Sequence, residues 1–184
     1  EWEEKLMSFS KTMIQQIDTL ARIASAFSDF ASLNAQNLEK TSLIKEVERV
    51  VTLFKNNNVT LVSSIVSEKP IYVMIDRSHL TRVLNNLINN SLQAQRDNNP
   101  VSVSIEIAKT PHNCLVKVID NGTGIPEKIQ NRIFEPNFTT KSSGTGLGLA
   151  MVKKIVDDFK GGITYKTSSK GTVFEISIPI YNNN

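Results

Sequence analysis

The chain has 184 residues, of which 40% are hydrophobic and 21% charged, a composition typical of a globular protein rather than a disordered one. Twenty-one Lys and Arg against 18 Asp and Glu give a net charge of +3, too weak and too dispersed to indicate nucleic-acid binding. No apolar run reaches the ~18 residues of a membrane span, and no signal peptide opens the chain. The single cysteine, Cys114, excludes a disulfide framework and fits a buried strand position in a reducing compartment.

The first part of the chain is predicted to be one long helix, because residues 3–36 contain neither Gly nor Pro. Apolar residues recur there at intervals of seven, at Leu6, Met13, Leu20 and Phe27, with a second seam at Ile17, Ala24 and Ala31. Such a narrow stripe is typical of a helix in a bundle, and the alternative is a helix lying on the core of its own domain. The chain begins inside this pattern and without Met, which indicates a segment cut from a longer protein.

The remainder mixes helices and strands. Helices are expected over 42–55, 77–96 and 147–159, the second of them capped by Asp76. Strands are expected over 59–66, 71–75, 101–108 and 114–120, and a closing hairpin over 163–168 and 172–180. The helices are too few for a doubly wound sheet. We therefore predict an α+β fold, a two-layer α/β sandwich in which one mixed sheet carries helices on one face.

The helix after Asp76 carries an unusual set of amides. Asn86, Asn89, Asn90 and Gln93 lie beside its apolar face, although Asn is a mediocre helix former. Asn86 and Asn90 are four residues apart and share one face. One amide oxygen, together with phosphate oxygens and water, is a usual way of holding Mg²⁺ with a nucleotide, and the alternative is a polar face in water.

Two glycine-bearing segments complete the candidate site. In IDNGTGIP (119–126) a strand ends at Asp120, two glycines follow, and Pro126 opens a short helix. A carboxylate there could accept a hydrogen bond from an exocyclic amine, or could simply belong to a turn. In IFEPNFTTKSSGTGLGL (133–149) a polar stretch between Phe138 and the glycines is typical of a lid, and the helix that follows aims its N-terminal amides at what the lid covers.

Together these pieces resemble the sensor histidine kinases of bacterial two-component signalling, within the wider class that includes gyrase, Hsp90 and MutL. NLINNS matches the Asn-rich box, DNGTG and GTGLGL match the two glycine boxes, and FEPNFTTK matches the Phe box, in the family's order and spacing. The wording of 16–33 and NLINNSLQA is most similar to the nitrogen-regulation (NtrB/NtrY-like) branch. The resemblance implies a Bergerat-type ATP-binding domain over 39–184, and over 1–38 the second helix of a truncated dimerisation bundle.

The resemblance also implies a role for each matching residue on the purine side of the site. Asp120 should hold the adenine amine, Gly122 and Gly124 should line the base pocket, and Thr172 should lie beside the adenine. The flanking motif positions Ile125 and Phe134 belong to the same ATP site.

On the phosphate side, the resemblance implies that Asn90 holds Mg²⁺ and that Asn86, one turn earlier, lies near the phosphates. Lys141 should reach the phosphates from the lid. The glycines should cradle them, and their neighbours complete the site: Thr140, Gly144, Thr145, Gly146, Leu147, Gly148 and Leu149. Ser91 stands where the family often has Ala.

One family feature is missing from these 184 residues. The phospho-accepting His lies in an H-E-x-x-N-P-type segment that the sequence lacks, and His79 and His112 are interpreted as surface or rim residues. The resemblance therefore implies an ATP- and Mg²⁺-binding part of a histidine kinase, facing the cytoplasm, whose acceptor His lies upstream of Glu1. Its expected partners are a response-regulator receiver domain and a second copy of the chain, bound through the N-terminal helix.

Two other functions remain open. Hydrolytic relatives carry a Glu one turn before the Mg²⁺-binding Asn, and an amide such as Asn86 cannot take a proton from water. This favours phosphoryl transfer over an ATPase. The second alternative is a non-catalytic module that senses nucleotide or dimerises.

Overall fold

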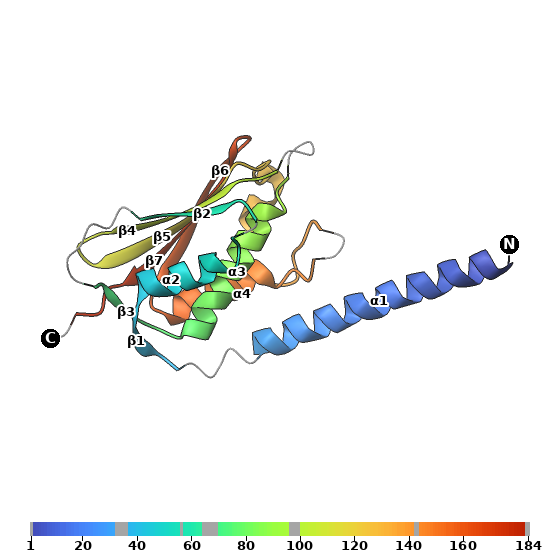
Figure 1. Cartoon of the computed structure of the whole chain (residues 1–184), viewed down its shortest axis with the longest axis horizontal. Coiled ribbons are helices and arrows are strands. Elements are labelled where there is room, and N and C mark those ends of the chain that lie inside the picture. Colours follow the sequence, from blue (N-terminus) through green and yellow to red (C-terminus); the bar gives the residue numbers. More distant parts are fainter. Residues whose placement is uncertain are drawn as a thin grey trace.

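The computed structural model describes residues 2–31, 37–55, 57–63, 70–95, 100–141 and 144–182. Figure 1 shows a long isolated helix followed by a compact domain. The elements in chain order are α1 (Trp2–Ala31), β1 (Glu39–Ser42), α2 (Leu43–Thr52), β2 (Val59–Ser63), β3 (Tyr72–Ile75), α3 (Arg77–Leu92), β4 (Val103–Lys109), β5 (Asn113–Asp120), the 3₁₀ helix η2 (Glu127–Arg132), α4 (Gly148–Asp158), β6 (Gly162–Ser168) and β7 (Gly171–Pro179).

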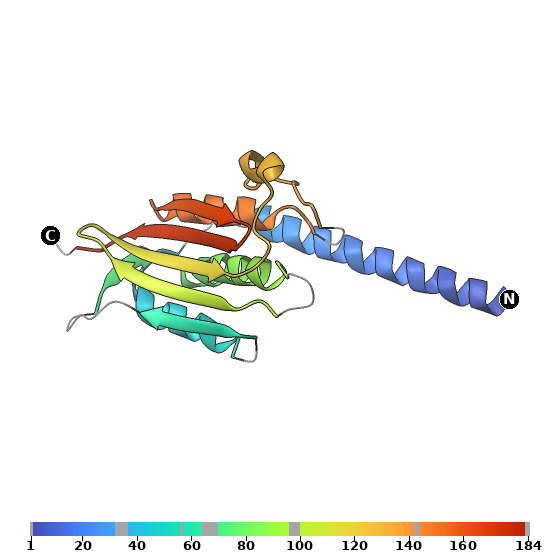
Figure 2. The same cartoon turned by 90° about the horizontal axis from the view of Figure 1, so that it is seen from above.

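The predicted leading helix is confirmed as α1, and residues 32–36 lie outside the described residues. In Figures 1 and 2 this helix extends away from the domain. Its apolar stripe is exposed, including Leu6, Met13, Ile17, Leu20 and Phe27. The alternative in which this helix lies on its own domain's core is therefore wrong for the described side chains. None of the helices in the described parts is both long and apolar enough to cross a bilayer.

The domain is built on a five-stranded mixed sheet in the order β2-β4-β5-β7-β6, in which β2 and β4 are parallel and the other neighbours antiparallel. Alternating residues of β5 and β7 are buried, because one face of the sheet is covered by α2, α3 and α4, as Figure 2 shows. This confirms the predicted two-layer arrangement. The core between the layers includes Leu84, Ile88, Val116, Val152 and Ile176, all with fully buried side chains.

A second, two-stranded sheet was not predicted. β1 pairs antiparallel with β3, and Val73 of β3 forms an isolated antiparallel bridge with Ile180 after β7. The predicted strands 59–66 and 71–75 thus belong to different sheets, and residues 64–69 between them lie outside the described residues. β3 was predicted as the strand 71–75, whereas β1 has only four residues, too few for a periodic pattern to separate it from a loop.

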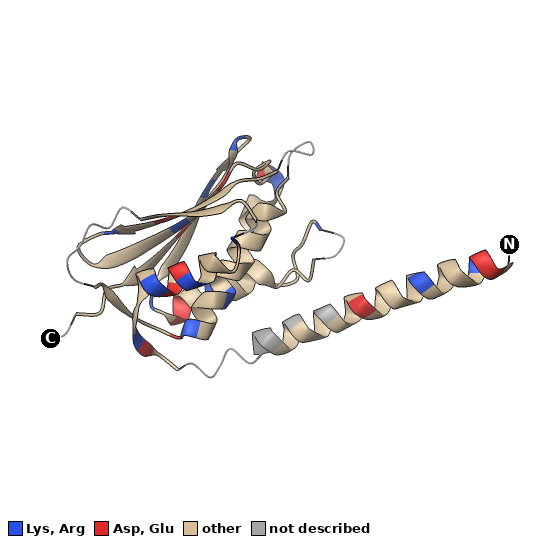
Figure 3. Cartoon of the chain, in the orientation of Figure 1, with Lys and Arg blue, Asp and Glu red and all other residues tan. Residues whose placement is uncertain are grey.

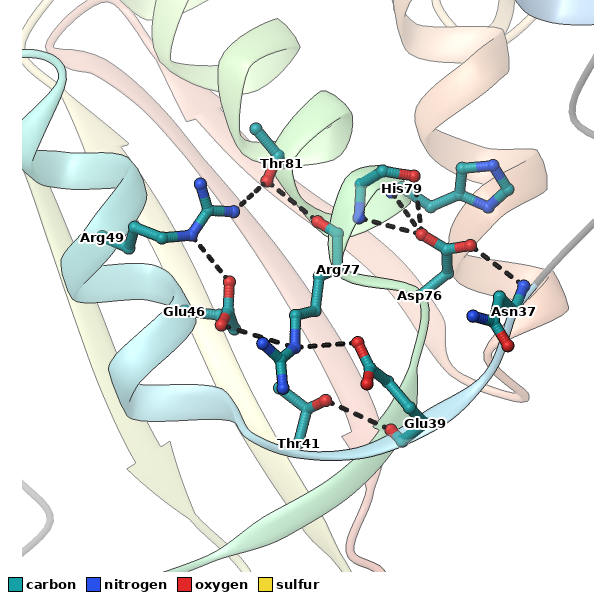
Figure 4. A network of polar contacts seen from close by, with 10 residues as sticks. Asn37, Glu39, Thr41, Glu46, Arg49, Asp76, Arg77, His79 and Thr81 are labelled. Carbon is teal, nitrogen blue, oxygen red and sulfur yellow. Dashed lines mark hydrogen bonds and ion pairs between the residues drawn. The ribbon is translucent and has the colours of Figure 1, made fainter.

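The chain enters the domain through a charged joint at the start of α3, drawn in Figure 4. Asp76 caps α3, as predicted, because its side chain accepts hydrogen bonds from the N–H groups of Ser78 and His79. Its other carboxylate oxygen accepts the N–H of Asn37 at 3.0 Å. These contacts fasten the segment that follows α1 to the first turn of α3.

Ion pairs reinforce this joint. Arg77 Nε lies 2.8 Å from Glu39 of β1 and 3.7 Å from Glu46 of α2, and Glu46 also pairs with Arg49 at 2.9 Å. Figure 3 shows charges of both signs gathered on α2 and the start of α3. The joint therefore connects β1, α2 and α3 through alternating charges.

The structure corrects two expectations about this region. α3 ends at Leu92, so the predicted helix 77–96 is shorter, and residues 96–99 lie outside the described residues. His79 is buried, with 5% of its surface exposed, and is not the surface or rim residue expected. It lies in the first turn of α3, where its main-chain N–H donates to the Asp76 carboxylate. His112 is exposed and Cys114 is buried, as predicted.

Candidate functional site

One cavity of about 640 Å³ lies at the end of the helical layer, within the range of about 300–1,000 Å³ usual for ligand pockets. Its walls come from the second half of α3, the loop after β5, the segment 138–141 with 144–146, the first residues of α4, and Thr172 and Phe174 of β7. α3 and α4 pack against each other beside it. Segments far apart in the sequence therefore meet at one opening, and the only charged residues among its described lining are Asp120 and Lys141.

Asp120 lies at the carboxyl end of β5, in the middle of the sheet, and is 6% exposed. Its Oδ1 accepts two main-chain hydrogen bonds, from Gly122 at 2.9 Å and from Thr172 of β7 at 3.1 Å. Among the described residues, Oδ2 has no hydrogen-bond partner. The carboxylate is thus held in place by one oxygen and offers the other to a donor in the cavity.

The loop after Asp120 is tied to its surroundings on both sides. A Cβ on Gly122 would collide with the Ala94 carbonyl and side chain, so the backbone of this loop touches the end of α3. On the other side, Ile125 N–H donates to Thr167 Oγ1 at 2.8 Å, and Thr167 shares a hydrogen bond with Thr172. The loop that follows the Asp120 carboxylate is therefore held in place from both sides.

The amide row of α3 belongs to the same cavity lining. Asn90 Oδ1 and Gln93 Oε1 both accept hydrogen bonds from the Lys141 ammonium, at 3.0 and 2.7 Å. Asn86 turns its Nδ2 back to the Arg82 carbonyl at 2.9 Å. Lys141 is exposed as a residue, but partial burial of its side chain lowers its pKa below the ordinary value. Two amide oxygens thus already hold a positive charge.

The first turn of α4 meets the same row. Gly148 lies so close to Asn86 that a Cβ there would stand 2.7 Å from Asn86 Oδ1. Leu147 precedes the helix, and no side chain of the described residues caps it. The N-terminal N–H groups of a helix are unpaired donors with a partial positive charge, suited to an anion. Gly148 and Leu149 line the cavity, so these donors border it.

Ser91 adds a buried polar group. The residue is 2% exposed and lines the cavity, and its hydroxyl has no hydrogen-bond partner among the described residues. A buried, unpaired hydroxyl costs free energy unless something in the cavity bonds to it. A ligand or an ordered water in the cavity would find a donor there.

Most of the predicted site residues meet in this cavity. Those in its lining are Asn86, Asn90, Asp120, Gly124, Ile125, Thr140, Lys141, Gly144, Thr145, Gly146, Gly148, Leu149 and Thr172. Three predicted residues are not in the lining: Gly122, Phe134 and Leu147. Gly122 packs against α3, Leu147 is 4% exposed before α4, and Phe134 lies edge-on to Tyr165 with ring centroids 6.0 Å apart.

Sequence reasoning gave no site role to several lining residues. Ser91 and Gln93 were noted only as neighbours of the matched positions, and Ile129, Ile133 and Phe174 form part of the apolar wall. The spacing of Gln93 three residues after Asn90 would have placed both on one helix face. The apolar residues carry no such signal, because core and pocket walls use the same residue types.

A metal centre made of protein ligands alone is not found in the described parts of the chain, where no three His, Cys, Asp or Glu side chains gather. The donor set around Asn90 is of another kind. It offers neutral amide oxygens, and the Lys141 ammonium bound to them shows that these oxygens can bind a positive charge. Such a set suits a hard ion that takes its other ligands from phosphate and water.

Comparison with known proteins adds the family. Residues 75–182 match the model of the histidine kinase-, DNA gyrase B- and HSP90-like ATPases. Sporulation kinase A of Bacillus subtilis (strain 168) is 39% identical over 144 residues, which are 78% of this chain and 23% of that protein. The sensory histidine kinase/phosphatase NtrB of Azospirillum brasilense is 48% identical over 67 residues, 36% of this chain and 17% of that protein. The chain thus spans about a quarter or less of these relatives.

Solved structures agree with the observed fold. The catalytic domain of histidine kinase ThkA is 29% identical with a TM-score of 0.68, over 78% of this chain and 95% of that domain. A larger ThkA structure, in complex with the response regulator protein TrrA, has a TM-score of 0.73 and 25% identity, over 91% of this chain and 49% of ThkA. The predicted fold class is confirmed by these likenesses.

Proposed function

The chain belongs to the histidine kinase-, DNA gyrase B- and HSP90-like ATPase family, and on that basis we propose that it is the ATP-binding catalytic part of a sensor histidine kinase. In this proposal the cavity binds Mg-ATP, and the γ-phosphoryl group passes to a His outside residues 1–184, with ADP as the leaving group. The phosphoryl group then moves to an Asp of a response regulator. Residues 1–38 form the second helix of the dimerisation bundle, and residues 39–184 form the catalytic domain.

The observation that carries the proposal is the polarity of the cavity. Asp120 presents a free carboxylate oxygen suited to an exocyclic amine, and its loop lies against Ala94 just after α3. The start of α4 lies against Asn86, two turns earlier on α3, and Lys141 adds a positive charge to the lining. An adenine nucleotide has the matching polarity, with an amine at one end and phosphates at the other. The donors on the phosphate side are main-chain N–H groups. They can donate to phosphate oxygens that approach the backbone where the glycines leave room.

Mg²⁺ fits the donors that surround Asn90. The bound ion would supply charge neutralisation and orientation of the transferring phosphates. Asn90 would contribute one amide oxygen to it. The Lys141 ammonium binds the same oxygen, which supports a cation site at this position. Lys141 would instead face the phosphates, where its charge offsets theirs. Because Gly148 has no side chain, Asn86 fits beside the start of α4. This would keep the amides of α3 close to the N–H groups at the start of α4.

Asn86 favours transfer over hydrolysis. Its Nδ2 donates to the Arg82 carbonyl, and its oxygen lies against Gly148, so the side chain is packed between α3 and the start of α4. An amide has no proton-accepting capacity near neutral pH. Without a general base, catalysis depends on positioning and charge, and the nucleophile is supplied by another part of the protein. The exposed stripe of α1 supports pairing with a second copy, which would bring that part near.

The test uses the chain together with a separate fragment that carries an H-E-x-x-N-P segment on a dimerisation helix. We expect label from γ-labelled ATP to appear on the His fragment in an acid-labile form, and Asp120→Asn to abolish the transfer. Steady release of phosphate without transfer would favour an ATPase. Nucleotide binding with neither transfer nor hydrolysis would favour the non-catalytic module.

A further inference from the structure

The Lys141 ammonium is held by two side-chain oxygens, one from Asn90 in the last turn of α3 and one from Gln93, the residue that caps its C-terminus. Its Nζ lies 3.0 Å from Asn90 Oδ1 and 2.7 Å from Gln93 Oε1, while no carboxylate of the described residues forms an ion pair with it. A surface lysine ordinarily points into water or pairs with an acid. Here the lysine of the segment 138–141 binds neutral amides instead, and all three residues line the cavity.

We propose that Lys141 is a built-in placeholder for the metal ion, an inference that rests on the proposed function. The ammonium occupies the cation position at Asn90 while nucleotide is absent, and Gln93 is the positioning residue that keeps it there. Mg²⁺ and the ammonium carry the same sign of charge and use the same oxygen, so both cannot lie there at full strength. Binding of the Mg-nucleotide therefore moves Lys141 off α3 and toward the phosphates.

The placeholder has two physical consequences. First, it gives the Asn90 and Gln93 oxygens a hydrogen-bond donor from the protein itself. Second, it makes the lysine and the metal partial substitutes for each other. A nucleotide that arrives without Mg²⁺ still meets one cation near Asn90, whereas a nucleotide with Mg²⁺ replaces that cation by a stronger one.

An ordinary phosphate-binding lysine would behave differently, and this separates the two readings. Any lysine near the phosphates strengthens nucleotide binding more when Mg²⁺ is absent, because the metal neutralises part of the phosphate charge. A lysine that stands in for the metal acts through the Asn90 oxygen. The extra contribution of Lys141 without Mg²⁺ should therefore be larger when Asn90 is present than in Asn90→Ala, and this difference is the coupling energy of the two residues.

The first experiment examines the nucleotide-free chain, so it does not depend on the proposed function. Lysines are acetylated competitively and read by mass spectrometry, with the exposed Lys170 as the internal reference. Because the two acceptors stabilise the ammonium and shield it, Gln93→Leu should raise the relative rate at Lys141 about threefold to tenfold. Gln93→Glu keeps an acceptor and should leave the rate at or below the wild-type value. An unchanged rate in Gln93→Leu would overturn the positioning role.

The second experiment measures ADP affinity by calorimetry with Mg²⁺ and with a chelator, in the wild type, Lys141→Met, Asn90→Ala and the double variant. Lys141→Met should raise the ratio of the two dissociation constants, without and with Mg²⁺, about threefold to tenfold more in the wild-type background than in Asn90→Ala. An equal rise in both backgrounds would refute the placeholder while leaving nucleotide binding intact. Absence of ADP binding in the wild type would instead refute the proposed function and with it the metal position, whereas the acetylation result would still decide whether Gln93 holds Lys141.

Discussion

The carboxylate of Asp120 is joined to Thr172 by a hydrogen bond of 3.1 Å from the Thr172 N–H, across two neighbouring strands of the main sheet. A second bond from the Gly122 N–H uses the same oxygen. The acceptor is therefore fixed by the backbone of the fold rather than by other side chains. Its other oxygen has no hydrogen-bond partner among the described residues, so it can accept a hydrogen bond from a ligand.

The hydroxyl of Ser91 predicts opposite effects on stability and on binding. Because the unpaired hydroxyl is buried, Ser91→Ala should stabilise the nucleotide-free chain by about 1 kcal/mol, a rise of roughly 2–4 °C in Tm. If the hydroxyl bonds to nucleotide or to a bridging water, the same variant should bind ADP several times more weakly. Thermal unfolding and calorimetry on one preparation measure both. A lower Tm in Ser91→Ala would show that the hydroxyl is already satisfied.

Gly148 predicts a second separation of folding from binding. In Gly148→Ala the new Cβ would lie 2.7 Å from Asn86 Oδ1, and the Asn86 side chain, held at its other end by the Arg82 carbonyl, must move. Ala favours a helix over Gly by up to about 1 kcal/mol. This gain offsets the cost of moving the Asn86 side chain, so the free energy of unfolding should change little. ADP affinity should fall by about tenfold. Gly162→Ala, in strand β6 and outside the cavity lining, is the matched control and should bind ADP as the wild type does.

The joint at Asp76 predicts how stability depends on pH. Burial alone would raise the pKa of Asp76, but hydrogen bonds from Ser78, Asn37 and His79, and the charge of His79, outweigh it and lower the pKa from 3.8 to about 2. Since the folded-state pKa is depressed, the stabilisation is fully present above about pH 4 and disappears as pH falls toward 2. We expect Asp76 to contribute about 1–2 kcal/mol at neutral pH.

Urea unfolding at several pH values checks this contribution. Asp76→Ala should be less stable than the wild type at pH 7, and the difference should shrink as pH falls through the window between 4 and 2. Asp158→Ala, which removes only the 3.3 Å pair with Lys154 at the end of α4, serves as the control and should cost little. A constant difference between wild type and Asp76→Ala down to pH 2 would contradict the assigned pKa.

Much of the fold followed from local patterns. Asp76 could be predicted as a helix cap because Asp before an apolar-periodic run has a known chemistry, and the alternation in 114–120 predicted strand β5. His79 was misjudged, because His occurs both at the surface and in the interior, and its position beside the Asp76 cap did not indicate that its side chain would be buried. The β1–β3 sheet was missed, because its pairing joins residues far apart in sequence.

For the site, the motifs predicted which residues line the cavity better than they predicted how those residues contact one another. Asp120 and Asn90 do line one cavity, yet nothing in the sequence indicated that the Asp120 oxygen would be fixed by Thr172 or that Asn90 would share Lys141 with Gln93. Those contacts depend on how β7 and residues 138–141 return to α3 and β5. Gly122 was placed in the pocket by its motif, whereas its missing side chain serves the approach of the loop to Ala94.

The measurement that bears most directly on the whole account is calorimetric titration of the chain with ATP and Mg²⁺, in the wild type and in Asp120→Asn. Asn keeps an oxygen that can accept the Gly122 and Thr172 N–H groups, so the variant should unfold within about 1 kcal/mol of the wild type. It replaces the negative oxygen that meets the purine, and we expect ATP affinity to fall by at least about tenfold, the loss of one charge-assisted hydrogen bond. Equal affinity in a folded Asp120→Asn would contradict the central role of this carboxylate.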